Sequence, residues 1–290
     1  MERTQNKYIA DRLREAAALL EQQGANRFRV NAYRKAAGTI ESLEHDVSFI
    51  FRTDGLHGLT ALPGIGPMIG GAIAEMIRTG QWTQLERLRG ALDPKALFGK
   101  VPGIGPKLAG RIINELHVDT LEALETAIYD GRLSKVPGFG ARRLAIVRST
   151  LAEMLGRKRW GVRTEQHEPP VKALLDVDRE YREKAGMGKL QKIAPRRFNP
   201  RNEAWLPVLH TERGLWQFTV LYSNTALAHE LGRNRDWVVI YFHTNSHAEG
   251  QRTVVTETQG ALRGKRVVRG RERECEEYYT PSLFDTLSVA

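Results

Sequence analysis

Three short segments of the sequence share one order of residue types: an apolar residue, proline, glycine, a second apolar residue and a second glycine. They span residues 62–66, 101–105 and 136–140, and their first glycines are 39 and 35 residues apart. Glycine permits a positive backbone φ and a close approach to another surface. A helix that begins directly after such a turn offers unpaired backbone N–H groups and the positive end of its dipole, which together can bind a phosphate oxygen. The chemistry predicted at these segments is therefore phosphate recognition.

We expect the phosphate contacts at the turns themselves and at the cations that follow the second and third of them. The first turn is followed by Met68, so the second ranks highest. A single copy would be explained equally well by an ordinary turn that packs against a core, but three copies in a basic chain favour phosphate binding. The predicted binding residues are Gly64, Ile65, Gly66, Gly103, Ile104, Gly105, Lys107, Arg111, Gly138, Gly140, Arg142 and Arg143.

The elements around these turns are predicted to be helices. Apolar residues recur at helical spacing over 6–23 and 29–43, and helical stretches flank every turn. Proline follows the second glycine of the first two turns, where the first turn of a helix needs no N–H. This is the helix-hairpin-helix pattern. We therefore predict an all-α first half with two domains, residues 1–90 with the first hairpin and residues 91–156 with the second and third.

The second half of the sequence has a different pattern. After a linker at 157–170 and a helix over 171–185, apolar and polar residues alternate in short runs, which is typical of strands. We predict that 171–290 forms an α+β domain with a mostly antiparallel sheet, of no recognised family, which could bind a protein partner. The whole chain is thus predicted to be a multidomain α+β protein. Strands are predicted over 205–210, 216–222, 237–243, 252–258 and 265–268, with a helix over 226–231.

The composition points to a polyanionic partner. The 290 residues include 44 Lys and Arg against 34 Asp and Glu, a formal net charge of +10, which favours nucleic acid. No apolar run approaches the roughly 18 to 20 residues that a membrane-spanning helix needs, and the N-terminus lacks the apolar stretch of a secretory signal. The single cysteine, Cys275, excludes an internal disulfide framework and fits a reducing compartment. We expect a cytoplasmic protein, associated with the nucleoid if bacterial, with no membrane partner.

Two groups of residues in the first half also carry a resemblance. The first group is 27–37, 62–66, Thr79-Gly80 and Leu85-Glu86, and the second is 101–115 and 133–140. The first group resembles the small N-terminal domain of family X DNA polymerases, and the second resembles the neighbouring fingers of that family. The resemblance covers about the first 155 residues. It implies modules that grip DNA on either side of a nick or short gap, the first near a downstream 5′ phosphate.

The resemblance ends before the catalytic parts of that family. The positions that correspond to its lyase lysines are Met68 and Ala72, so chemistry through a Schiff-base amine is not expected. Asp176 and Asp178 form a close carboxylate pair, but they lie among charges at helical spacing, which predicts a solvated helix face and not a metal-binding palm. We therefore predict no polymerase activity, no catalytic residue and no cofactor.

Three groups of polar residues in the second half leave alternatives open. Asp236 and Glu257 could position a divalent metal as in a nuclease, but ordinary roles are favoured and no metal site is predicted. Six cations between 263 and 273 either protect a sheet edge or contact a DNA backbone, and we favour the second. Four histidines could gather around a metal, although ordinary strand and loop roles are favoured: His210, His229, His243 and His247.

The sequence thus predicts a DNA-binding protein that contacts the phosphate backbone without reading the base sequence, with a role in repair or maintenance. Its partner would be duplex DNA, including nicked, gapped or ended duplexes. The alternative is an enzyme, a structure-specific nuclease or DNA end-processing factor whose active site lies in the second half.

Overall fold

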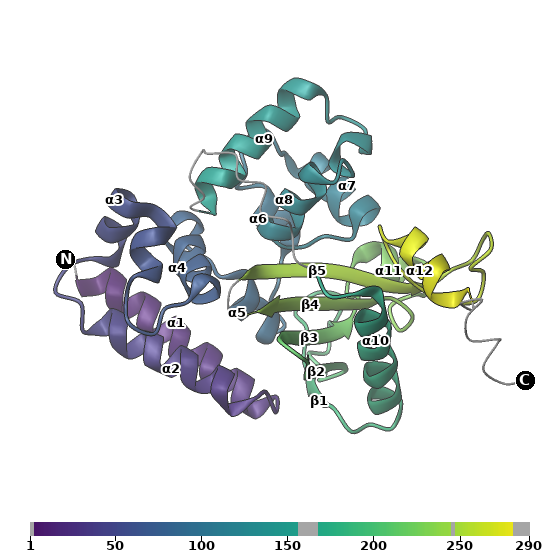
Figure 1. Ribbon diagram of the computed structural model, residues 1–290, viewed down its shortest axis with the longest axis horizontal. Coiled ribbons are helices and arrows are strands. Elements are labelled where there is room, and N and C mark those ends of the chain that lie inside the picture. Colours follow the sequence, from purple (N-terminus) through teal and green to yellow (C-terminus); the bar gives the residue numbers. More distant parts are fainter. Residues whose placement is uncertain (1–2, 156–167, 245–246, 281–290) are drawn as a thin grey trace, which may run out of the picture.

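The computed structural model describes residues 3–155, 168–244 and 247–280. The first half is all-helical and the second half is built on one sheet (Figure 1), which confirms the predicted α+β class. The first half contains α1 (Arg3–Gln22), α2 (Arg27–Glu41), α3 (Val47–Thr60), α4 (Pro67–Thr79), α5 (Thr83–Leu88), α6 (Pro94–Phe98), α7 (Pro106–Leu116), α8 (Leu121–Tyr129), the 3-10 helix η1 (Leu133–Lys135) and α9 (Ala141–Met154). The second half contains α10 (Val171–Gly186), β1 (Gln191–Ile193), β2 (Leu206–Arg213), β3 (Trp216–Tyr222), α11 (Ala226–Glu230), β4 (Val238–Thr244), β5 (His247–Thr256), β6 (Arg266–Val268) and α12 (Glu272–Tyr279).

Helices α1 to α5 enclose one hydrophobic core. The apolar stripe predicted on α1 is fully buried, and it packs against the stripe of α2. Helix α2 begins where Asn26 caps it, because the Asn26 side chain accepts a hydrogen bond from the Phe28 N–H at 2.7 Å. The buried residues of the two stripes include Ile9, Leu13, Ala16, Ala17 and Leu20 on α1, and Val30, Tyr33, Ala37 and Ile40 on α2.

Helices α6 to α9 enclose a second, separate core. It includes the apolar residues of the second and third hairpins, Ile104 and Phe139, and the inner face of α9. The two helical groups therefore bury their hairpins in different cores. The predicted linker at 157–170 lies almost entirely outside the described residues, which resume at Glu168.

The second half folds into a six-stranded antiparallel sheet whose strands follow one another in chain order, β1 to β6. Side chains alternate between its two faces. Phe218, Val220 and Ile240 lie in the core that the sheet shares with α10, which crosses in front of the strands in Figure 1. Their neighbours Thr219 and Tyr241, on the opposite face, are buried against the helical first half. Both faces of the sheet are therefore covered.

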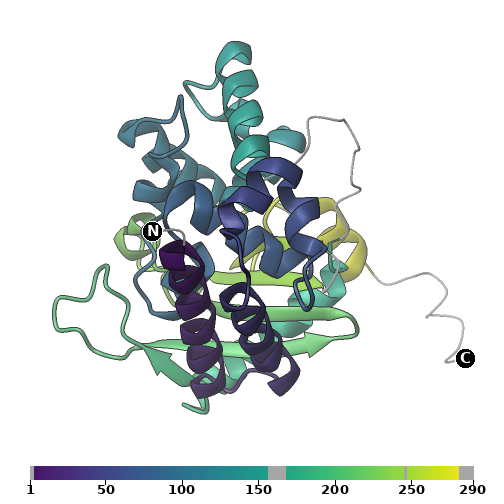
Figure 2. The ribbon, with the colours of Figure 1, turned by 90° about the vertical axis from the view of Figure 1, so that its left-hand side faces the viewer.

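Strand β5 connects the sheet to both helical groups through two side chains on one face. Glu249 Oε2 accepts a hydrogen bond from Arg87 Nη2 of α5 at 2.6 Å. Gln251, two residues further, donates to the carbonyl oxygen of His117 at 3.1 Å and accepts from the Asp119 N–H at 3.2 Å. Figure 2 shows α1 and α2 in front of the sheet, so the helical half lies along the face opposite α10.

Two elements were not predicted, β1 and α12. The basic run at 263–273 includes all of β6 and the first residues of α12. Strand β6 ends at Val268 and α12 begins at Glu272. Only Cys275 of α12 is buried, so the helix has no apolar stripe to reveal it. No helix in the described ranges is both long and apolar enough to span a bilayer.

Candidate nucleic-acid interface

The three hairpins have one backbone geometry. Gly64, Gly103 and Gly138 have φ of +75°, +89° and +101°, a conformation that side chains with a Cβ rarely adopt. The second glycine of each hairpin is extended and directly precedes α4, α7 or α9, and no side chain caps these helix starts. The apolar residue between the glycines is buried in every copy. Each hairpin therefore anchors itself in a core and leaves the N–H groups of the following helix without a side-chain partner.

The predicted turns lie at the surface. All six glycines are exposed, while Ile65, Ile104 and Phe139 are buried beneath them. Lys107, Arg142 and Arg143 are also exposed, and Arg111 is half-buried. The six exposed glycines are Gly64, Gly66, Gly103, Gly105, Gly138 and Gly140.

The second and third hairpins lie against each other's helices. A Cβ added at Gly103 would lie 3.7 to 3.8 Å from side chains of α9, which include Val147 and Arg143. A Cβ added at Gly138 would meet Leu108 of α7 at 2.8 Å. This reciprocal packing brings two hairpins and the starts of two long helices into one region, so the groups predicted to bind phosphate are close together.

Two of the predicted arginines contact the third hairpin directly. Arg111 Nη1 donates to the Pro137 carbonyl oxygen at 2.7 Å, and Arg143 Nη1 donates to the Gly138 carbonyl oxygen. A guanidinium has five N–H donors, so each arginine retains donors for a ligand. Arg111 and Arg143 thus shape the turn as well as supplying charge beside it, a role that sequence spacing did not reveal.

The first hairpin has its cation from another helix. The aliphatic stem of Lys35, on α2, lies over Gly64, with three of its carbons 3.0 to 3.1 Å from where a Cβ would be. Thr39, one turn further along α2, donates a hydrogen bond to the Pro63 carbonyl oxygen at 2.8 Å. Lys35 was not among the predicted binding residues, because it precedes Gly64 by 29 residues and only cations that follow a hairpin were predicted to contact phosphate. The run 27–37 that carries the resemblance was the available signal.

The helix after the first hairpin faces the sheet. Met68 and Ala72 of α4, at the positions of the lyase lysines, line a small pocket together with Glu75 of the same helix and Glu249 of β5. Glu75 accepts hydrogen bonds from the backbone N–H and the hydroxyl of Thr83, the first at 3.0 Å. This pocket is lined by carboxylates and apolar groups, so it lacks the amine that Schiff-base chemistry needs.

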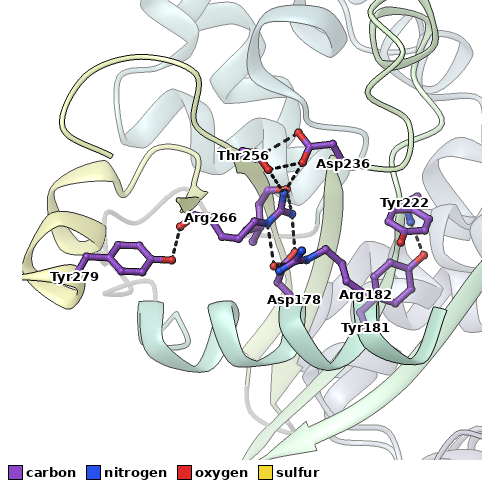
Figure 3. Close-up of polar contacts among 9 residues, drawn as sticks. Asp178, Tyr181, Arg182, Tyr222, Asp236, Thr256, Arg266 and Tyr279 are labelled. Atoms are coloured by element: carbon purple, nitrogen blue, oxygen red, sulfur yellow. Dashed lines mark hydrogen bonds and ion pairs between the residues drawn. The ribbon is translucent and has the colours of Figure 1, made fainter. Parts of the chain in front are cut away.

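The carboxylates of the second half are paired with arginines. Arg266 of β6 binds both oxygens of Asp178 at 2.7 and 3.0 Å and Asp236 Oδ1 at 2.7 Å (Figure 3). Thr256 donates to Asp236 at 2.5 Å. Asp178 is fully buried, so the predicted solvated helix face is wrong at that position. The reason is a compensating cation 88 residues away, which the local pattern of charges cannot reveal.

Glu257 is held by a separate set of donors. Arg269 Nη1 donates to it at 2.6 Å, and the backbone N–H groups of Thr258 and Gln259 donate at 2.8 and 3.2 Å. Burial opposes ionisation of this carboxyl, but these hydrogen bonds outweigh it and hold the pKa of Glu257 below its usual value. Asp236 and Glu257 are therefore each bound to a different arginine.

The histidines named above have separate environments. His210 lies 3.1 Å from Thr219 and 3.1 Å from Gln23, His229 lies 2.7 Å from Asn224, and His243 is buried in the sheet face. The side chain of His247 lies outside the described part of the chain. Within that part, no group of three or more His, Cys, Asp and Glu residues could hold a metal ion.

Four of the six cations between 263 and 273 make ion pairs inside the protein. Their partners are the carboxylates of α10, α12 and the β5–β6 connection, together with Glu168 and Asp236. This arrangement favours a structural role for Arg266, Arg269 and Arg271 over contact with a DNA backbone, whereas the pair of Arg273 with Glu277 is exposed. The four paired cations are Arg266, Arg269, Arg271 and Arg273.

Comparisons with known proteins give matches in the first half. A helix-hairpin-helix domain model matches residues 4–82, and a SAM-like helix-hairpin-helix tandem model matches 56–119 and 100–151. A DNA polymerase/3'-5' exonuclease PolX from Bacillus subtilis (strain 168) is 30% identical over 143 residues, which is 49% of this chain and 24% of that protein. The chain thus matches about a quarter of the length of this relative. The helix-hairpin-helix domains support DNA binding. The first half of the chain is a helix-hairpin-helix region related to the family X DNA polymerases.

Proposed function

We propose that this chain binds duplex DNA through its phosphate backbone, without reading the base sequence, in DNA repair or maintenance, and that it has no polymerase activity. The observation that carries the proposal is the reciprocal packing of the second and third hairpins, which gathers exposed glycines, uncapped helix starts and cations. Each of these groups favours an anion, and none of them offers a pattern that distinguishes one base from another.

The phosphate contacts are assigned to three kinds of group. The N–H groups at the start of α7 and α9 would donate to phosphate oxygens, since no side chain caps them. Gly105 and Gly140 have open space where a Cβ would be, so a phosphate can approach the backbone there. Lys107 and Arg142 lie in the first turn of the two helices and would add charge.

The first hairpin would supply a further contact. Its glycines are exposed and Lys35 lies over Gly64, although α4 faces the sheet. A nicked, gapped or ended duplex would place one stretch of backbone at this hairpin and another at the second and third. The relation to PolX, a polymerase and exonuclease by name, supports a repair or maintenance role for this region.

We also propose the division of the chain into residues 1–90, 91–156 and 171–290. Support comes from the separate hydrophobic cores of α1–α5, of α6–α9 and of the sheet with α10. The second half would position the helical groups, because β5 contacts both of them.

Replacement of Gly105 tests the proposal. Its φ of −84° suits any residue and no atom lies within 4 Å of the added Cβ, so Gly105→Val should fold normally while blocking the approach of a phosphate. We expect roughly tenfold weaker binding of a labelled duplex in fluorescence anisotropy. Gly186→Val, at the exposed end of α10, also has open space and is the matched control.

Salt dependence gives a second readout. If the hairpins contact about four phosphates, raising salt from about 50 to about 200 mM should weaken duplex binding by roughly 100-fold. Affinity that is unchanged by salt, or unchanged in a correctly folded Gly105→Val, would contradict the proposal.

A further inference from the structure

The loop between β1 and β2 and the short helix α11 place one exposed and two half-buried aromatic rings beside arginines. Phe198 is 46% exposed, and its ring centroid lies 4.7 Å from that of His229 at an interplanar angle of 33°. Trp205 meets the same histidine edge-on, with the centroids 6.0 Å apart. Arg197 lies over the ring of Phe198 at 5.2 Å. We call this group the Phe198 surface; it consists of Arg196, Arg197, Phe198, Trp205, Asn224 and His229.

The two stacked rings are held in place. Asn224 Oδ1 lies 2.7 Å from Nε2 of His229, and Asn224 Nδ2 donates to the Arg197 carbonyl oxygen at 3.2 Å. Phe198 has a φ of +53°, which a bulky residue adopts only when its surroundings impose it. Burial, and then the charge of Arg197, lower the pKa of His229, so the imidazole is neutral near pH 7. The surface therefore presents the ordered ring of Phe198 to solvent, with the uncharged, half-buried imidazole of His229 behind it.

The cations around these rings differ from those elsewhere in the second half. Arg196 and Arg197 make no ion pair with any carboxylate of the described residues, and the same holds for Arg233 and Arg235, which follow α11. By contrast, Arg213 and Arg266 are each bound by two carboxylates. Unpaired arginines beside the exposed ring of Phe198 complement a ligand that carries both phosphates and flat rings.

A pocket adjoins the surface. Arg197 and Asn224 line it together with Arg87, Asp119 and Tyr241. Its volume of about 60 Å³ has room for a few water molecules at roughly 10 to 15 Å³ each, and it is too small to enclose a nucleobase. Arg87 is 3% exposed, and its Nε and Nη1 have no hydrogen-bond partner among the described residues; neither does Asp119 Oδ1. A ring stacked on Phe198 could thus direct only a polar edge group toward these atoms.

We infer that the Phe198 surface binds unpaired nucleotides of DNA, with a base stacked on Phe198 and its phosphates beside Arg196 and Arg197. Unpaired nucleotides are required because the bases of a continuous duplex are stacked on each other and hide their flat faces. The inference rests on the proposed function, since it names the DNA structure that the second half would recognise. It assigns a binding task to the second half of the chain.

The loop is also fixed to the helical half. The Arg196 N–H donates to the Gly90 carbonyl oxygen at 2.7 Å, and a Cβ at Gly90 would lie 2.7 Å from the Ala194 carbonyl oxygen. Gly90 lies two residues after the end of α5, and the backbone of the loop can pack there because Gly90 has no side chain. Unpaired nucleotides at the Phe198 surface and a duplex at the hairpins would therefore lie on parts of one rigid assembly.

The test uses the full chain and two fluorescein-labelled probes, a dT oligomer and a continuous duplex, in anisotropy titrations. Phe198→Asn removes the ring, while asparagine tolerates the left-handed backbone at this position. We expect binding of the dT oligomer to weaken roughly tenfold and duplex binding to stay within about twofold. Phe198→Tyr should bind the oligomer like the wild type, because the ring is retained.

Matched controls separate this site from general effects. Phe49→Ala removes a 57% exposed ring from α3, and Arg179→Ala removes an exposed cation from α10 on the other side of the sheet. Neither should change oligomer binding, whereas Arg197→Ala should weaken it. Unchanged oligomer binding in both Phe198→Asn and Arg197→Ala, or an equal loss in Phe49→Ala, would overturn the inference.

Failure of the proposed function gives a different pattern. If Gly105→Val leaves duplex binding unchanged while Phe198→Asn still weakens oligomer binding, the hairpin assignment fails and the Phe198 surface stands. If Gly105→Val weakens duplex binding and Phe198→Asn has no effect on oligomer binding, the hairpin assignment stands and the inference for the Phe198 surface fails.

Discussion

The first hairpin and the pair formed by the second and third have the same backbone and different surroundings. All three combine a glycine at positive φ, a buried apolar residue and an uncapped helix start. The helix after the first hairpin, α4, turns Met68 and Ala72 toward β5 and the carboxylate of Glu249. The helices after the other two pack around each other's hairpins and keep Lys107 and Arg142 in solvent.

The hairpin motif thus specifies a local backbone shape, and the elements packed around each copy determine what that shape can contact. The first hairpin has one cation, Lys35, from an earlier helix, and part of its unit is used to bind the sheet. The second and third hairpins have cations on their own helices. We therefore expect perturbations of the first unit to affect mainly stability, and perturbations of the other two to affect mainly DNA affinity.

The largest effect is expected at the contact between the first unit and the sheet. Arg87→Met leaves the half-buried Glu249 without its ion-pair partner and removes the guanidinium 3.4 Å from the Tyr241 ring centroid. We expect the free energy of unfolding in urea to fall by about 3 kcal/mol. The double variant Arg87→Met/Glu249→Gln should recover part of this loss, because no charge stays unpaired. A loss below about 1 kcal/mol would show that the contact is not a stabilising link.

The next effect is a loss of stability in acid. Burial above all, and then neighbouring arginines, hold the pKa of His210 and His243 well below 6.5, and burial lowers the pKa of His117 to about 4. As the pH falls below about 6.5, these histidines therefore take up protons in the unfolded chain but not in the folded protein. The free energy of unfolding then decreases by up to about 1.4 kcal/mol per pH unit for each histidine. Asp119 opposes this, since burial raises its pKa to about 6 and the folded protein gains that proton first.

Three histidines outweigh one aspartate, so stability should decrease between about pH 6.5 and pH 5. Urea titrations across this range give the slope. His243→Gln should make the slope shallower by about one proton, because burial, and then the charge of Arg29, hold the pKa of this histidine well below 6.5 in the folded protein. The exposed His45→Gln is the control. A slope that His243→Gln leaves unchanged would place this histidine outside the transition.

A smaller effect is expected on DNA affinity at the second and third hairpins. The double variant Lys107→Gln/Arg142→Gln removes two exposed cations from the first turns of α7 and α9. Duplex affinity should fall roughly tenfold, and the slope of log affinity against log salt should become shallower by about two. Thermal unfolding should be unaffected because both side chains are exposed. A variant that keeps the wild-type salt slope would move the DNA contact elsewhere.

The smallest effect is expected at the first hairpin. Lys35→Gln should weaken binding of a continuous duplex by only about twofold and reduce the salt slope by about one at most. The loss should be larger for a gapped duplex with a 5′ phosphate than for one with a 5′ hydroxyl, if this hairpin contacts the phosphate at a break. Equal losses for the two gapped probes would show that the first hairpin contacts the DNA backbone without recognising the 5′ phosphate at a break.

Local patterns predicted the parts of the fold that local physics determines. The apolar stripes of α1 and α2, the three hairpins and the strand at 216–222 appear as expected. Strand β1 and helix α12 were missed, because a three-residue strand shows no alternation and α12 buries one residue. The sequence also could not place Lys35 over Gly64.

The features that the sequence did not predict depend on side-chain pairs between residues far apart in the chain. Arg266 joins Asp178 to Asp236, and Arg87 joins α5 to Glu249, 162 residues later in the chain. Such pairs depend on the packing of whole elements, so neither spacing nor charge count reveals them. The Phe198 surface was hidden for the same reason, since its stacked histidine comes from α11, 31 residues beyond the phenylalanine.

Adjacent same-face side chains of β5, Glu249 and Gln251, are attached to different helical groups. This strand therefore acts as a fixed spacer that sets the distance between the first hairpin and the other two. A hinge would let the protein adapt to whatever DNA it meets. With a spacer, the DNA has to do the bending, and a strand break is where a double helix bends most readily.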